Sequence, residues 1–100
     1  MAEMLKRAED MSDFFFQYLI TLATSAEMSL TAPPRYGTTT LMRAFKLALE
    51  MPLKSREIED KDVYKRLRKL MEENRDLPTF HTKEWDELVK KVVAMLMEEL

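Results

Sequence analysis

The chain has 100 residues, of which 46% are apolar and 34% charged, with 16 basic against 18 acidic side chains. This length allows one domain, and the composition excludes both a disordered tail and a polycationic nucleic-acid binder. A folded chain of this size buries roughly two-thirds of the surface that its unfolded form exposes, enough for one modest core but not for a deep internal cavity as well. We therefore expect any functional site at a surface, a groove or a subunit junction.

The composition also removes most cofactor and catalytic chemistries. Without cysteine, disulfides, thiolate nucleophiles and cysteine-ligated zinc are excluded. His81 is the single histidine and Gly37 the single glycine, so one chain cannot build a three-histidine zinc site or a glycine-rich phosphate loop. We expect no cofactor and no metal, and we interpret His81 as a solvent-facing loop residue. An enzyme is the least supported class, with a site assembled across a dimer as the open alternative.

Cellular location is indicated by absences. A cysteine-free chain is typical of an intracellular protein, and the first thirteen residues lack the positive region of a secretory signal, so we expect a cytoplasmic protein. The apolar run over residues 14–32 approaches membrane-spanning length, but polar residues recur in it at three- and four-residue steps. This spacing favours a buried amphipathic helix. Abundant Glu, Lys and Arg, with one Asn and one Gln, favour a thermophilic source.

The spacing of apolar residues predicts an all-α single domain, residues 1–100, built as a small bundle of four helices. The first helix covers residues 12–30 if Ser12 or Asp13 caps it, or residues 2–30 if the heptad-like pattern continues through Ser12. Pro33 and Pro34 end it. The others are predicted over residues 38–51, 60–73 and 82–100, with Thr82 as a cap. Their predicted core positions are Leu41, Phe45, Ala48 and Leu49, then Val63, Leu67, Leu70 and Met71, then Trp85, Leu88, Val89, Val92, Val93 and Leu96.

Two segments carry more apolar surface than one helix face can bury. Three consecutive phenylalanines cannot face one neighbour, because successive helical side chains point about 100° apart. The C-terminal segment around Met95 and Met97 is apolar around most of its circumference. We therefore predict a non-enzymatic interaction module that forms a homodimer through the first and last helices. The candidate interface residues are Phe14, Phe15, Phe16, Tyr18, Met95 and Met97.

Two other functions remain as alternatives. The segment from Arg35 to Thr40 combines a guanidinium, the flexible Gly37 and the hydroxyls of Thr38, Thr39 and Thr40, which suit a phosphate or carboxylate, although a capped turn is the simpler reading. A basic cluster predicts phosphate contacts in a nucleic-acid complex, but acidic residues at helical spacing interleave it, so a solvated helix face is favoured. The members of this cluster are Lys61, Lys65, Arg66, Arg68 and Lys69.

About a third of the chain contains a sequence pattern that resembles a known family. It comprises Tyr18-Leu19-Ile20, Ala26, Pro33, Tyr36-Gly37, Leu41-Met42, Ala44 and Leu47. This pattern resembles a family of short bacterial and archaeal helical proteins known as a domain of unknown function. The resemblance implies a small helical fold and assigns no activity, and it draws attention to the corner at Tyr36 and Gly37.

Overall fold

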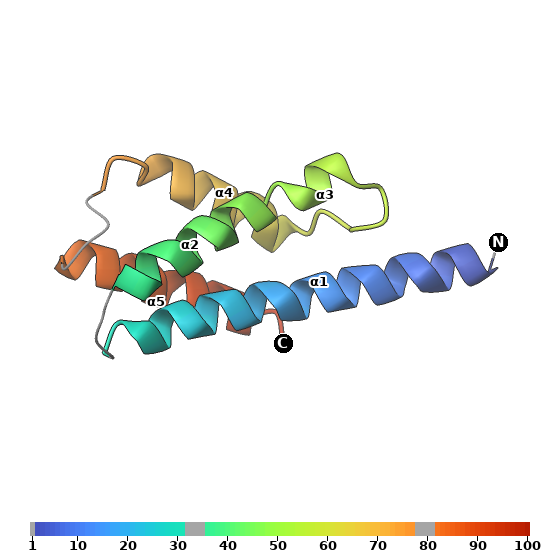
Figure 1. Cartoon of the computed structure of the whole chain (residues 1–100). Helices are drawn as coiled ribbons and strands as arrows, with labels where there is room; N and C mark the ends of the chain where they lie inside the picture. Colours follow the sequence, from blue (N-terminus) through green and yellow to red (C-terminus); the bar gives the residue numbers. More distant parts are fainter. Residues whose placement is uncertain (1, 32–35, 78–81) are drawn as a thin grey trace.

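Five helices make up most of the chain that the computed structural model describes, which is residues 2–31, 36–77 and 82–100. They are α1 (Ala2–Ser29), α2 (Tyr36–Ala48), α3 (Met51–Lys54), α4 (Asp62–Glu73) and α5 (Lys83–Met97). Since α3 is a single turn and no strand occurs in these ranges, the predicted all-α bundle of four helices is confirmed. Figure 1 shows α2 and α5 against the C-terminal half of α1, with α4 packed beyond them.

The first helix takes the longer of its two predicted forms. Ser12 lies inside α1 and does not cap it. Polar residues are accommodated because the hydroxyls of Thr21 and Thr24 donate to backbone carbonyls four residues earlier, at 2.9 and 2.8 Å. The helix therefore satisfies these groups itself while its apolar face packs inward. The prolines predicted to end it, Pro33 and Pro34, lie outside the described residues.

Small side chains bring α1 and α2 together. Ala23 and Ala26 are fully buried, and the Thr38 hydroxyl donates to the backbone carbonyl of Ala26 across a 3.1 Å hydrogen bond. This approach is possible because alanine projects little beyond the helix backbone. This hydrogen bond holds the first turn of α2 against α1.

Three predicted details differ from the structure. The second helix ends at Ala48, and Pro52 stands in the first turn of α3, where its missing N–H costs no hydrogen bond. Met42 is buried on α2, and Leu41 is only partly so, because the buried face is rotated toward Thr38 and Met42. The predicted stripe of α4 lacked Tyr64, which is completely buried.

The last helix follows its prediction closely. Thr82 caps α5 by accepting a 3.1 Å hydrogen bond from the backbone N–H of Trp85. Every predicted core residue of α5 is buried except Val93, which is partly buried against the core. This helix has the most regular apolar spacing in the chain, so its spacing identifies the buried face.

The molecule is elongated because α1 is longer than the body that covers it. Its 28 residues span about 42 Å at the usual helical rise, and the molecule measures 49 × 25 × 21 Å. In Figure 1 the N-terminal turns of α1 extend past the other helices. The radius of gyration, 14.4 Å, accordingly exceeds the roughly 13 Å of a compact domain of this length.

Candidate functional site

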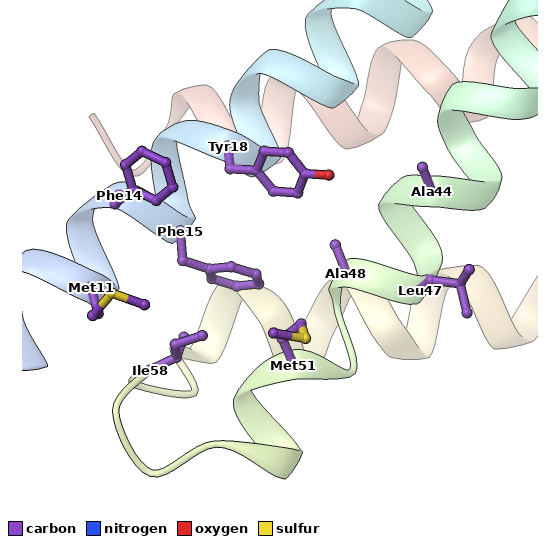
Figure 2. A pocket seen from close by; sticks show the side chains of 9 residues that line it. All are labelled: Met11, Phe14, Phe15, Tyr18, Ala44, Leu47, Ala48, Met51 and Ile58. Atoms are coloured by element: carbon purple, nitrogen blue, oxygen red, sulfur yellow. The ribbon is translucent and has the colours of Figure 1, made fainter.

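An apolar groove opens on the surface between α1 on one side and α2 with α3 on the other. Its volume is about 520 Å³. Figure 2 shows the side chains that line it, and a tyrosine hydroxyl is their single polar group. They are Met11, Phe14, Phe15, Tyr18, Ala44, Leu47, Ala48, Met51 and Ile58.

The α1 wall is one face of a helix. Met11, Phe14, Phe15 and Tyr18 follow one another at three-, one- and three-residue steps, which places them on adjacent rows of the same side. Phe14 is 68% exposed and Tyr18 is also exposed, whereas Phe15 is 6% exposed. The phenylalanine ring of Phe15 thus forms part of the floor, and Phe14 stands at the edge.

The opposite wall alternates small and large side chains. Ala44 and Ala48 leave the hollow open, while Leu47, 69% exposed, and Met51 border it. Leu47 follows Lys46 in the sequence and lies four residues after Arg43, so this large apolar side chain shares its side of α2 with basic residues. Both walls of the groove therefore expose large apolar side chains to solvent.

Ser12 fixes the loop that closes one end of the groove. Its hydroxyl accepts a 2.9 Å hydrogen bond from the backbone N–H of Glu59 and donates to the carbonyl of Glu57 at 3.5 Å. Ile58, between these two residues, is 5% exposed and lines the groove. The serine that the sequence suggested as a helix cap instead attaches a distant loop to α1.

Arg68 fixes the same loop from the other side. Its guanidinium donates to both carboxylate oxygens of Asp60, at 2.8 and 2.6 Å, and to the backbone carbonyl of Leu49 at 2.9 Å. The two side chains are 17% and 21% exposed, so water screens this pair less than an ordinary surface pair. Arg68 therefore joins the end of α2 to the segment before α4.

Tyr64 fills the space beneath the groove floor. Its ring meets Phe15 edge-on, with the centroids 5.5 Å apart at 90°, and Phe16 at 6.4 Å. Burial raises its pKa to about 12, and the nearby carboxylates of Glu59, Asp60, Asp13 and Glu99 add to this shift. The Tyr64 hydroxyl is buried without a hydrogen-bond partner among the described residues. This aromatic layer supports the groove from inside.

The predicted interface residues fall into two groups. Phe14, Tyr18 and Met97 are exposed, whereas Phe15 and Phe16 are 6% and 8% exposed, and Met95 is partly buried against the core. The prediction that Phe15 and Phe16 need a second subunit to cover them is corrected, because Tyr64 and the loop around Ile58 cover them within the chain. The ammonium group of Lys61 also lies 4.4 Å from the centroid of the Phe16 ring.

The predicted anion corner is described only in part, from Gly37 to Thr40. Gly37 and Thr38 lie in the first turn of α2, and the Thr38 hydroxyl is buried and bonded to Ala26. A Cβ on Gly37 would meet the Ser29 hydroxyl oxygen at 3.7 Å, an ordinary contact, so close packing does not demand glycine there. Thr39 and Thr40 already have interaction partners. Arg35 and His81 lie outside the described residues.

The basic cluster is divided among intramolecular contacts. Arg68 holds Asp60 and Leu49, and Lys61 covers Phe16. Arg66 pairs with Glu99 at 3.3 Å, and Lys65 lies 3.8 Å from Asp62. Arg66 and Arg68 therefore pair with the C-terminus and with the loop before α4, and not with the acidic residues that interleave them at helical spacing. Lys69 is exposed, and the cluster does not present a continuous row of cations.

Comparisons with protein-family models, with curated proteins and with solved structures give no match. The family resemblance stays a prediction. Among the described residues, no three acidic or histidine side chains gather to hold a metal ion. Within the same part of the chain, no helix combines the length and the hydropathy needed to cross a bilayer.

Proposed function

We propose that this protein is a non-enzymatic interaction module that forms a homodimer through the apolar groove. The observation that supports this is the placement of the exposed large apolar residues. Five of them line the same groove. They are Met11, Phe14, Tyr18, Leu47 and Met51. Apolar residues scattered singly over a surface are common, but a cluster of this kind calls for an explanation. Exposed apolar patches of this kind are typical of surfaces that a partner covers.

The shape of the molecule favours a second copy of the chain as that partner. The N-terminal turns of α1 extend past the body (Figure 1). The same helix forms one wall of the groove. A two-fold axis along the groove sets the α1 wall of each copy over the α2 wall of the other. Phe14 of each subunit then covers Leu47 of its partner, which makes the contact self-complementary, as a closed dimer requires.

The proposed interface differs in one part from the sequence hypothesis. The first helix takes part as predicted, but α5 supplies no residue to the groove, and α2 with α3 takes its place. Met97 is exposed on α5 outside this surface. We propose the cytoplasm as the location, an assignment that rests on the cysteine-free composition.

The proposal is tested by the mass in solution of the wild type and of three single variants. Leu47→Glu and Phe14→Glu place a charge in the groove, which an apolar interface cannot bury unpaired. Met28→Glu is the matched control, because Met28 is also on α1, is 74% exposed and does not line the groove. Light scattering over a concentration series and circular dichroism for helix content are measured on all four proteins.

We expect the wild type and Met28→Glu to reach about twice the 11.9 kDa of one chain. Leu47→Glu and Phe14→Glu should stay at the single-chain mass with unchanged helix content. A wild type that remains at the single-chain mass at every concentration contradicts the proposal. Equal dissociation of the Met28 variant would show that the contact lies elsewhere on the surface.

A further inference from the structure

A second hollow lies on another face of α2, between that helix, the end of α4 and the start of α5. Its volume is about 210 Å³, several times the roughly 30 Å³ that one water occupies in the liquid. The residues around it combine basic and apolar side chains. They are Thr39, Met42, Arg43, Lys46, Met71, Asn74, Arg75, Trp85 and Leu88. We call this hollow the cationic cleft.

Three cations border the cationic cleft, and no acidic residue belongs to its described lining. Arg43 and Lys46 come from one face of α2, and Arg75 follows the end of α4. Arg75 also pairs with Glu72 and lies 4.0 Å from Asp76. Both of these pairs are exposed, and such pairs contribute little, so an incoming anion can compete for the guanidinium. An anion placed among these three side chains is attracted by each of them.

The inner side of the cationic cleft is apolar. Met42, Met71, Trp85 and Leu88 are all buried and belong to the core. An indole and two thioethers form a polarizable surface that suits an aromatic or aliphatic group. Asn74 adds an amide, but its side-chain nitrogen already donates to the carbonyl of Leu70 at 2.9 Å. A ligand for this cleft therefore needs an apolar body and an anionic head.

We propose that the cationic cleft binds a small phosphate monoester that carries an apolar group. Phosphate is preferred to carboxylate because a dianion matches several cations better than a monoanion does, and because two guanidinium groups offer paired donors for its oxygens. The phosphate lies among Arg43, Lys46 and Arg75, and its apolar group lies against Trp85. This site is separate from the groove and does not depend on dimer formation.

Trp85 provides a direct test, because it is the single tryptophan of the chain. Its fluorescence is recorded while phenyl phosphate is added at constant ionic strength to the full chain. Inorganic phosphate and benzoate are added in parallel, since the first lacks the apolar body and the second lacks the dianionic head. The titrations are repeated with Lys46→Gln and with Lys91→Gln, which removes an exposed charge of α5 outside the cleft.

We expect a saturable change with phenyl phosphate and at least about tenfold weaker binding of the other two anions. Lys46→Gln should weaken the binding of phenyl phosphate about fivefold or more, and Lys91→Gln should leave it unchanged. The proposal is overturned if phenyl phosphate gives no saturable change up to about 10 mM. Equal weakening by the two variants would reduce the effect to general charge screening, and benzoate binding as tight as phenyl phosphate would contradict the phosphate assignment.

Discussion

The two sides of α1 between residues 11 and 18 differ sharply although they belong to the same turns. The inner side carries Phe15 and Phe16, which pack against Tyr64 and lie beneath the loop that Ser12 holds. The outer side carries Phe14 and Tyr18, which line an open groove and are exposed. Consecutive residues of identical type thus have opposite environments, because a helix turns about 100° at each residue.

This contrast separates what the chain needs for folding from what it offers to a partner. The inner side is secured by ring contacts, a cation over an aromatic face and hydrogen bonds to a distant loop. The outer side exposes apolar surface to water, which is unfavourable for a single chain. Substitutions on the two sides should therefore act on different measurements, stability on the inner side and assembly on the outer side.

The largest effect on stability is expected from Tyr64→Ala. Removal of a fully buried aromatic ring leaves a cavity against Phe15 and should lower the free energy of unfolding by about 3 kcal/mol. Phe14→Ala, on the exposed side, should change it by less than about 0.5 kcal/mol. Urea unfolding measures both, in the Leu47→Glu background, so that dissociation of a dimer does not contribute. Similar losses for the two variants would remove the distinction between the sides.

A smaller loss of stability is expected from Arg68→Gln. The variant breaks the partly buried pair with Asp60 and the hydrogen bond to the Leu49 carbonyl, at a cost of about 2 kcal/mol. Arg66→Gln is the control on the same helix, because its pair with Glu99 is more exposed and should contribute less than about 1 kcal/mol. Urea unfolding compares the two variants, and hydrogen exchange of the Glu59 amide, which donates to the Ser12 hydroxyl, reports whether the loop loosens.

Equal stability of the Arg68 and Arg66 variants would contradict the role given to Arg68. Unchanged exchange at the Glu59 amide would show that Ser12 alone holds the loop. Both measurements report on the loop around Ile58, which covers the inner side of α1 and closes the groove at one end.

Local patterns were sufficient to predict the four longer helices, whereas the single turn of α3 was not predicted. The apolar spacing of α5 and its Thr82 cap depend on residues within the same segment, and the structure has both as predicted. The start of α1 was left open between two alternatives, and the structure has the longer one, which the heptad-like spacing had indicated. Helix formation is governed by neighbours in the sequence, so a single sequence contains most of the information.

The groove could not be predicted in the same way, because its walls depend on contacts between distant segments. Tyr64 was not assigned to the core, since its burial follows from where Phe15 and Phe16 pack. Two signals were available: the phenylalanine triplet, which marked Phe14 on the α1 wall, and Leu47, a large apolar residue on a helix side shared with basic residues. Ser12 and Arg68 looked like a cap and a surface cation, and their roles appear only when the loop is in place.

Among substitutions on the inner side of α1 and the layer that supports it, the smallest effect at neutral pH is expected from Tyr64→Phe, which compares the buried tyrosine with the exposed Tyr18. The Tyr64 hydroxyl is buried without a hydrogen-bond partner among the described residues, so its removal should change the free energy of unfolding by at most about 1 kcal/mol, toward greater stability. Burial, aided by the carboxylates around it, raises the pKa of Tyr64 from 10.0 to about 12. The folded protein therefore retains this proton where the unfolded chain releases it.

The contribution of Tyr64 to stability is complete below the pKa of the unfolded chain and is lost as the pH rises from about 10 to about 12. The wild type should consequently lose up to about 2 kcal/mol more than Tyr64→Phe across this interval. Urea unfolding in the Leu47→Glu background, near neutral pH and near the upper end of the interval, measures the difference. Tyr18→Phe should follow the wild type, because its ring lies on the exposed side of α1. If Tyr64→Phe follows the wild type as well, the layer beneath the groove is open to water, and the two sides of α1 are less different than the packing indicates.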